Sequence, residues 1–297
     1  KDVPVKNQIS EFELKEIDRN KLYNFLREME FNRLLSSVIS TYGDIEFSNK
    51  TKVFDKEDKN HKISNKNYEL IQKEEDIDKW LNEAEENGEI AVDTETSSLD
   101  PHQAKLVGIS FSTKIGKACY IPIGHTEGKN LEEKNVIKKI KPILEDKSIR
   151  KIGQNIKFDY IILYHKGINM NAMEDTMLMS YVLDAGKNRH NMDTLSEIHL
   201  DHKTIAFKDL VGTGKKQINF SEVKIDIAKD YAAEDADITF RLYKTFSKNL
   251  KLEKLLNIYE IFEKPLIKIL ALMEICGIKV NQKFLQLLSN KFEKKIN

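Results

Sequence analysis

The stretch Glu89-Ile90-Ala91-Val92-Asp93-Thr94-Glu95-Thr96 decides the fold, because an apolar run ends in acidic residues. Residues 89–93 predict a buried strand. Side chains two apart on a strand point to the same side, so Asp93 and Glu95 would present two carboxylates where the strand leaves the core. Like charges this close are costly unless a cation lies between them. The alternative is a strand end that runs into a solvated acidic turn.

The pattern outside this strand is typical of an α/β fold. Two further apolar runs, 106–112 and 118–123, flank the turn-like residues 114–117, so we expect an antiparallel meander. Short strands near 151–153 and 172–174 then alternate with helices. Helices are expected over 76–87, 131–144, 158–163, 177–183, 192–200 and 225–250. Strands followed by interleaved helices indicate a mixed sheet covered on both faces.

Composition excludes several classes of protein. The chain has 297 residues, and 48 Lys and Arg balance 48 Asp and Glu. Zero net charge argues against a polybasic factor that clamps duplex DNA by counterion release. Two cysteines cannot make a disulfide framework and suit a reducing cytosol. The apolar stretches are too short to cross a membrane, so we expect a cytoplasmic protein without a membrane partner.

Both ends of the chain differ from this α/β region. The spacing of Leu22, Phe25, Leu26 and Met29 predicts a helix capped by Asp18. Residues 48–67 are mostly polar and predict a linker. A helix over 266–276, with Pro265 near its start and Gly277 after its end, follows the α/β region. The chain starts with Lys1 and ends in a helical-looking segment, so we expect a fragment of a longer protein.

Two other segments carry acidic residues that could join the first pair. In Gly153-Gln154-Asn155-Ile156-Lys157-Phe158-Asp159 a strand passes through a polar turn into a helix. Here Asn155 could simply cap that helix and Asp159 complement its dipole. In Tyr231-Ala232-Ala233-Glu234-Asp235-Ala236-Asp237 a spacing of four places Tyr231 and Asp235 on one helical face. The alternative for this segment is an exposed acidic turn of a surface helix.

Four carboxylates from three separate segments suit a site for two Mg²⁺ or Mn²⁺ ions. Hard divalent cations prefer oxygen ligands, and phosphoryl-transfer enzymes hold such ion pairs with a few carboxylates. The four are Asp93, Glu95, Asp159 and Asp235. Spacing alone does not establish that they meet in space.

These motifs resemble a known family. Asp93-Thr94-Glu95, Asn155-x-x-x-Asp159 and Tyr231-x-x-x-Asp235 are similar to the three motifs of the DEDD exonucleases, tyrosine branch. Residues 68–250 resemble, in order, the 3′ to 5′ proofreading domain of bacterial family A polymerases of the DNA polymerase I type. The resemblance implies the ribonuclease H-like fold, with a five-stranded mixed sheet flanked by helices and extra helical segments at both ends.

The resemblance also implies a mechanism and its residues. Asp93, Glu95 and Asp235 would hold one metal ion, and Asp93 and Asp159 the second. Tyr231 would orient the attacking water together with Glu95. The product would be a 5′ mononucleotide from the 3′ end of DNA. The implied DNA contacts are Leu99 and Phe207 at the terminal bases, and Gln154, Asn155, Phe158 and Arg189 near phosphates and sugars. For Leu99 and Phe207 the alternative is ordinary core packing.

The domains, partners and competing functions follow from the same resemblance. Residues 1–40 would be the remnant of a 5′ nuclease domain with its connector helix, and residues 41–67 would be a polar linker. The exonuclease domain would cover residues 68–250, and residues 251–297 would be the start of a polymerase domain. The partners would be a single-stranded or frayed 3′ end and the rest of the polymerase chain, and we expect a monomer. Two alternatives are an inactive spacer within a family A polymerase and a free-standing RNA exonuclease. The complete acidic set opposes the first, and the polymerase-like ends oppose the second.

Overall fold

The computed structural model describes residues 17–29, 31–43, 66–214 and 217–296. The chain forms two compact units, Lys1–Lys59 and Asn60–Asn297. In the first unit, α1 (Arg19–Glu28) and α2 (Asn32–Tyr42) pack together. Asp18 caps α1 by accepting from the Lys21 N–H, as predicted. The predicted division of 1–67 between a nuclease remnant and a linker remains a prediction, and much of it lies outside the described residues.

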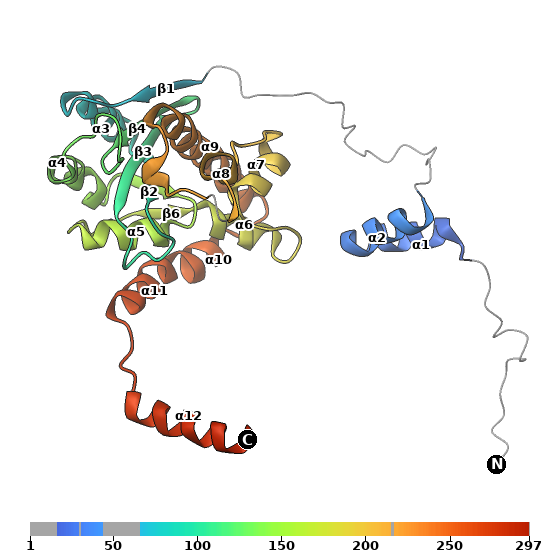
Figure 1. The fold of residues 1–297 in the computed structure, drawn as a ribbon. Coiled ribbons are helices and arrows are strands. Elements are labelled where there is room, and N and C mark those ends of the chain that lie inside the picture. Colours follow the sequence, from blue (N-terminus) through green and yellow to red (C-terminus); the bar gives the residue numbers. More distant parts are fainter. Residues whose placement is uncertain (1–16, 30, 44–65, 215–216, 297) are drawn as a thin grey trace, which may run out of the picture. The chain divides into compact units, whose positions relative to one another are not determined.

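The second unit is built on one sheet (Figure 1). Its strands are β1 (Asn67–Leu70), β2 (Glu89–Thr96), β3 (Leu106–Lys114), β4 (Lys117–Pro122), β5 (Arg150–Gly153) and β6 (Met173–Asp175). Their order is β1-β4-β3-β2-β5-β6. Among these described strands β3 alone runs against its neighbours, because it pairs antiparallel with β2 and β4 while the other pairs are parallel.

The predicted mixed sheet and its antiparallel meander are confirmed, but the sheet has six strands rather than five. The additional strand is β1, which pairs parallel with β4 at the sheet edge, Asn67 opposite Lys117 and Leu70 opposite Tyr120. The predicted linker ends at residue 67, where β1 begins. Four residues with a polar start give too short a pattern to separate an edge strand from a linker.

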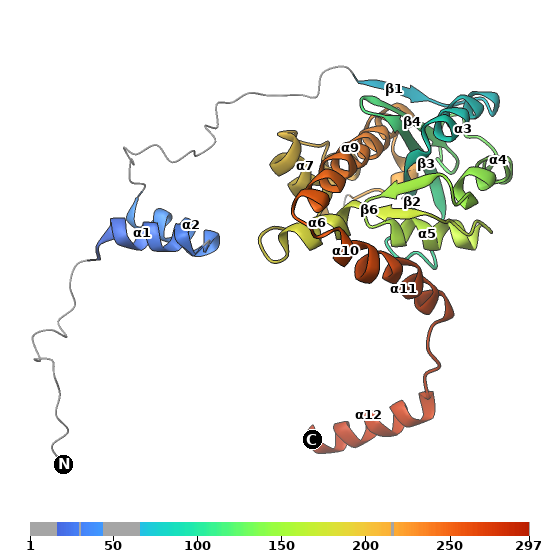
Figure 2. The same ribbon diagram turned by 180° about the vertical axis from the view of Figure 1, so that it is seen from behind.

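Helices cover both faces of the sheet (Figures 1 and 2). One face is covered by α9 (Ile225–Leu252), which carries α6 (Thr176–Asp184) and α7 (Met192–Leu200) against it. The other is covered by α3 (Glu75–Asn87), α4 (Glu133–Glu145) and α5 (Ile156–His165). Along β2, Ile90 and Val92 join the core on the α5 side, whereas Ala91 joins the core under α9. The alternation of a strand therefore directs Asp93 and Glu95 toward α9 and Thr94 toward α5.

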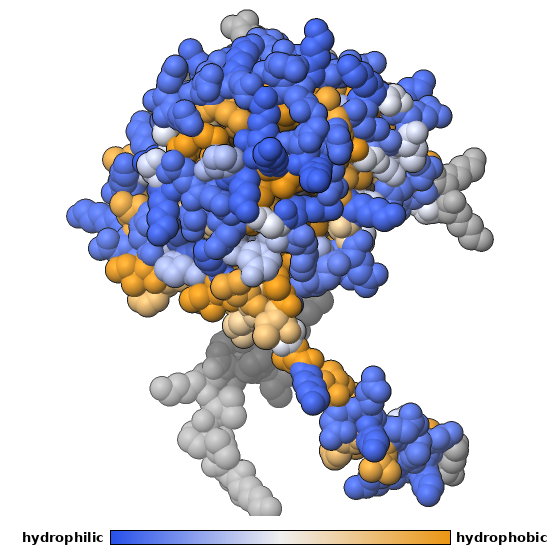
Figure 3. Space-filling model, turned by 90° about the vertical axis from the view of Figure 1, so that its left-hand side faces the viewer, coloured by the Kyte–Doolittle hydropathy of each residue, from blue (hydrophilic) through white to orange (hydrophobic). Residues whose placement is uncertain are grey.

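Short elements and two further helices complete this unit. They are α8 (Phe207–Val211), the 3₁₀ turn η3 (Phe220–Glu222), α10 (Leu256–Ile258), the π-helical η4 (Tyr259–Glu263), α11 (Lys264–Cys276) and α12 (Gln282–Ile296). Gly277 ends α11 with φ 66°, as predicted. No described helix is both long and apolar enough to span a bilayer. Apolar side chains gather at the surface where α11 leaves the sheet domain (Figure 3), among them Ile269 and Met273.

Candidate metal centre

Three carboxylates meet where β2 ends beside α9. Asp93 and Glu95 come from β2 and Asp235 from α9, and one ligand oxygen from each lies within 4.8 Å of the others. Glu95 and Asp235 are buried, and Asp93 is half-buried. The structure therefore rules out a solvated acidic turn at Glu95.

The sequence on both sides of the cluster allows this close approach. On α9 the small side chains of Ala232, Ala233 and Ala236 are fully buried, and α9 packs directly on β2, β3 and β4. On the sheet, Gly108 is the register partner of Glu95. A Cβ at Gly108 would lie 2.1 Å from the Tyr120 hydroxyl, so only glycine leaves room for that ring. Small residues thus bring the helix and Tyr120 up to the carboxylates.

Burial and mutual repulsion make these carboxyl groups hard to ionise without a cation. Burial raises the pKa of Asp93 to about 6. Burial, followed by the charges of its acidic neighbours, raises the pKa of Glu95 well above its ordinary value. The pKa of Asp235 is raised in the same way, first by burial and then by Asp93. A cation among these groups would reverse the effect by favouring their charged forms.

The donor set fits a hard divalent cation. All three ligands are carboxylates, which Mg²⁺ and Mn²⁺ prefer. The Glu95 Oε1 atom is buried and has no hydrogen-bond partner, although buried polar atoms normally have one. An ion in the cluster would satisfy this oxygen. The acidic cluster can therefore hold a metal ion.

Asp159 reaches the same region from the opposite side of β2. Its Oδ1 accepts from the Thr94 N–H at 2.9 Å and from the Thr94 hydroxyl at 2.6 Å. It is 3% exposed, and burial followed by the charge of Asp93 raises its pKa well above the ordinary value. Asp159 lies outside the three-residue group but within electrostatic reach of it. It does more than complement the dipole of α5, because its carboxylate is fixed to the strand that carries Asp93 and Glu95.

Asp175 at the end of β6 fixes the start of α5, and the sequence did not single it out for this role. Its Oδ1 accepts from the N–H groups of Asn155 and Met177, and its Oδ2 from the Ile156 N–H at 3.0 Å. Asn155 is left-handed, with φ 58° and ψ 45°, and makes no side-chain capping bond. The alternative in which the Asn155 side chain caps the helix is therefore wrong: Asn155 is at the N-cap position, but Asp175 accepts from the first N–H groups instead.

Aromatic rings lie beside the cluster. Tyr231 is half-buried on α9, and burial followed by the charges of Asp235, Glu95 and Asp93 raises its pKa above the ordinary value. Its ring centroid is 6.0 Å from those of both Phe207 and Phe220. The Phe207 and Phe220 rings are parallel within 5° at 6.1 Å. Phe207 is 43% exposed, so part of its ring is open to solvent.

The structure places the other predicted DNA contacts in different settings. Leu99 is 93% exposed on the loop after β2, so the core-packing alternative is wrong for it. Gln154 donates to the His190 carbonyl at 2.8 Å. Phe158 is half-buried against the core on the α5 side, and Arg189 is exposed. Only Phe207 of this predicted set has a ring contact with Tyr231 among the described residues.

The acidic run on α9 is buried rather than an exposed turn. Besides Asp235, both Glu234 and Asp237 are at most 1% exposed. Asp237 accepts from the Tyr68 hydroxyl at 3.0 Å and the Gly116 N–H at 2.7 Å, and so joins α9 to β1 and to the β3–β4 turn. Glu234 instead bonds to His202 and Ile205, in the segment before α8.

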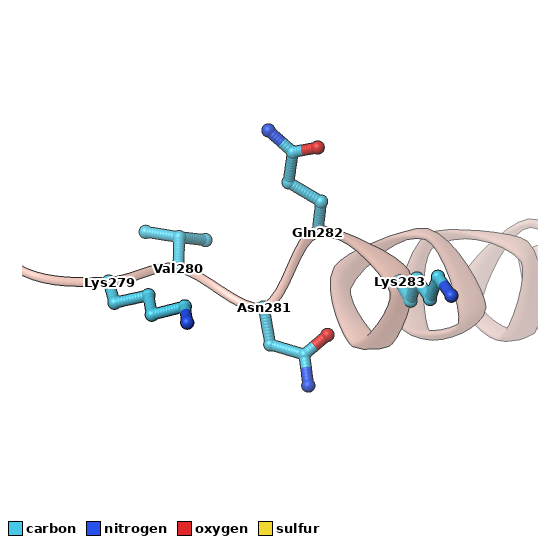
Figure 4. A pocket seen from close by; sticks show the side chains of 5 residues that line it. All are labelled: Lys279, Val280, Asn281, Gln282 and Lys283. Atoms are coloured by element: carbon cyan, nitrogen blue, oxygen red, sulfur yellow. The ribbon is translucent and has the colours of Figure 1, made fainter.

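One hollow away from the cluster does not carry this chemistry. It has a volume of about 460 Å³ and runs along residues 279–283, between α11 and α12. Figure 4 shows Lys279 and Asn281 pointing to one side of this extended segment and Val280 and Gln282 to the other. These side chains only line their own segment, and no carboxylate is among them.

Comparisons with known proteins agree with this geometry. A family described as 3′-5′ exonuclease matches residues 68–251. DNA polymerase I of Rhizobium leguminosarum is 41% identical over 236 residues, which are 72% of this chain and 23% of that protein. DNA polymerase I of Pseudomonas aeruginosa is 38% identical, and the match covers 77% of this chain and 26% of that protein. This chain thus spans about a quarter of the curated relatives it matches.

Solved structures share the fold at low sequence identity. Brucella melitensis NrnC with bound Mg²⁺ has a TM-score of 0.52 at 23% identity, covering 72% of this chain and 96% of that one.

Proposed function

The chain belongs to the 3′-5′ exonuclease family, and from this premise we propose that it removes 5′ mononucleotides from the 3′ end of DNA. The observation that carries the proposal is the cluster of Asp93, Glu95 and Asp235, in which one oxygen from each carboxylate lies within 4.8 Å of the others. The relatives that support it are bacterial DNA polymerases I. We therefore assign it to proofreading within such a polymerase, as a monomeric chain of the cytoplasm and nucleoid.

Two divalent ions, Mg²⁺ or Mn²⁺, would be held by the four carboxylates. We assign one to Asp93, Glu95 and Asp235, and the other to Asp93 and Asp159. When bound, such ions lower the pKa of a bound water and neutralise charge on the phosphate. The bonds from Thr94 go to Asp159 Oδ1 and so do not engage Oδ2, which supports this second assignment.

Tyr231 orients the attacking water together with Glu95 in this proposal. Its raised pKa keeps the phenol protonated at neutral pH, so it donates a hydrogen bond rather than removing a proton. The Glu95 carboxylate is buried, and its Oε1 atom has no hydrogen-bond partner among the described residues, which supports a role at the reacting phosphate.

The DNA contacts are divided by chemistry. Leu99 and Phe207 would contact the terminal bases, because both side chains are exposed and apolar. Stacking on an aromatic face tolerates any base, as removal of any misinserted nucleotide requires. Gln154, Asn155, Phe158 and Arg189 would lie near the phosphates and sugars. Phe158 has no hydroxyl, so it would contact the DNA through its ring alone.

The test is nucleotide release from a 3′-labelled single-stranded DNA oligomer with Mg²⁺ or Mn²⁺. We expect 5′ mononucleotides from the wild type and a loss of at least 1,000-fold in Asp93→Ala, about the 4 kcal/mol scale of a lost charge-stabilising group. The control is Asp209→Ala, which removes an exposed carboxylate. No release by the wild type, or undiminished release by Asp93→Ala, contradicts the proposal and favours a structural spacer. An RNA oligomer in parallel tests the RNA alternative.

A further inference from the structure

A short segment between α7 and α8, residues 201–206, brings Phe207 to the cluster, and we call it the strap. It leaves α7 at Asp201, whose φ of 49° turns the chain out of the helix. The His202 carbonyl accepts from the Ser196 hydroxyl at 2.8 Å, which fixes the first part of the strap to α7. The Thr204 hydroxyl donates to Asp193 Oδ1 at 2.6 Å, which adds a second tie to the same helix.

The strap is joined to α9 through the carboxylate of Glu234. The Ile205 N–H donates to Glu234 Oε2 at 2.7 Å, and His202 Nε2 donates to Oε1 at 3.0 Å. Lys66, just before β1, donates to Oε1 at 2.5 Å. Glu234 is 1% exposed, so it is a buried carboxylate whose hydrogen bonds come from two chain segments. Hydrogen bonds to a buried charged group are among the stronger ones in proteins.

Glu234 and Asp235 are neighbours on one rigid helix but face different parts of the molecule. Asp235 joins Asp93 and Glu95, whereas Glu234 holds the strap. Phe207 follows directly after the strap, at the start of α8, and its ring lies against those of Phe220 and Tyr231. Phe207 also lines a hollow of about 500 Å³ together with Lys203 and Lys208. One helix therefore fixes both the carboxylates and the aromatic surface beside them.

We propose that Glu234 is a positioning residue of the exonuclease: it sets the distance between the Phe207 ring and the metal centre, so that a nucleotide base stacked on Phe207 presents its phosphate to the carboxylates. This inference rests on the proposed function. It assigns Glu234 no contact with substrate or metal, because its carboxylate is occupied by the strap and Lys66. Loss of Glu234 should therefore raise the KM for DNA while leaving metal binding unchanged.

The test compares Glu234→Ala with Asp237→Ala on the single-stranded DNA oligomer, measuring KM and kcat separately. Asp237 is a matched control, because it is equally buried on α9 and accepts from Tyr68, Gly116 and Arg241 rather than from the strap. We expect Glu234→Ala to raise KM about 10-fold, on the scale of one base-stacking contact. Asp237→Ala should change KM less than 2-fold. Calorimetry should show unchanged Mn²⁺ binding in both variants.

A double variant tests whether Glu234 acts through Phe207. If it does, Glu234→Ala added to Phe207→Ala should raise KM no further, since the surface it positions is already gone. Glu234→Gln keeps one acceptor oxygen, and its KM should lie between those of wild type and Glu234→Ala. Should Glu234→Ala not fold, Thr204→Val loosens the strap from its α7 side and should raise KM as well.

The outcomes separate this inference from the proposed function. A wild type that releases no nucleotide refutes the proposed function itself. An active wild type whose KM is unchanged in Glu234→Ala and Thr204→Val overturns the role of Glu234. Additive effects of Glu234→Ala and Phe207→Ala, or loss of Mn²⁺ binding in Glu234→Ala, also overturn it, because Glu234 would then act by another route.

Discussion

At the scale of single residues, Thr94 joins the two sides of the site. It lies between Asp93 and Glu95 in sequence, yet it faces α5 and holds Asp159 through both its N–H and its hydroxyl. Thr94→Val keeps the shape and the backbone bond but removes the hydroxyl donor. We expect kcat to fall about 10-fold, which corresponds to about 1.4 kcal/mol, because Asp159 loses one of two bonds that orient it.

Single-turnover cleavage of the DNA oligomer measures this effect. The control is Thr245→Val, which removes a hydroxyl that donates to the Arg241 carbonyl within α9. An equal loss in both variants would show that Thr94 has no special role in orienting Asp159.

Asp93 gives the metal-free protein a characteristic pH dependence. Its folded pKa of about 6 exceeds the ordinary value of 3.8, so the folded state holds this proton more tightly than the unfolded chain. Stability therefore falls as pH rises from about 4 to about 6, by at most about 3 kcal/mol. With a chelator present, Asp93→Asn should raise the melting temperature at pH 8 by several degrees and change it little at pH 4. Thermal unfolding of both proteins at the two pH values measures this, and a variant less stable at pH 8 contradicts it.

At the scale of elements, the loop over 97–105 is a separately braced structure. The Ser97 N–H and hydroxyl both bond to the Lys105 backbone, and Asn219 donates to the Ser97 carbonyl at 2.7 Å. On its other side, His102 Nδ1 lies 3.2 Å from Nε2 of His165 at the end of α5. The loop carries the exposed Leu99, and these contacts fix its base and one flank.

Loss of the histidine contact should loosen the flank of this loop but not its base. We expect His165→Ala to raise KM for the DNA oligomer about 3-fold without changing kcat, since one exposed hydrogen bond contributes about 0.5–1 kcal/mol. His102→Ala should have the same effect, and the double variant should be no worse than either alone. An additive double variant would mean that the two histidines act separately.

At the scale of the whole molecule, the second unit should not need the first for its own fold. The boundary between the two units lies between Lys59 and Asn60. Lys66 and β1 belong to the second unit, because Lys66 donates to Glu234 and Tyr68 of β1 donates to Asp237 on α9. A chain that starts at residue 60 should thus keep its resistance to urea and its exonuclease rate. A chain that starts at residue 72 loses β1, and we expect it to be several kcal/mol less stable. Equal urea midpoints for the two truncations would contradict this view of β1.

Local patterns in the sequence predicted much of the fold and part of the site. A strand period of two placed Asp93 and Glu95 together, and a helical spacing of four placed Tyr231 with Asp235. The bond between Thr94 and Asp159 was not predictable, because it joins residues 65 apart through the tertiary fold. The role of Asp175 was hidden for the same reason. Glu234 and Asp235 look alike in sequence, and only the packing of α9 shows that they face different partners.

The position of α9 across the sheet has a consequence for the timing of folding. The pairs β2–β3 and β3–β4 join strands that are neighbours in the sequence, whereas α9 contacts five strands that all precede it in the sequence. Contacts between distant segments form late because their loop closure is entropically costly. We therefore expect the sheet domain to acquire its carboxylate cluster last as it folds. Mn²⁺ binding followed during refolding should appear with the slowest phase, and binding in an early phase would contradict this order.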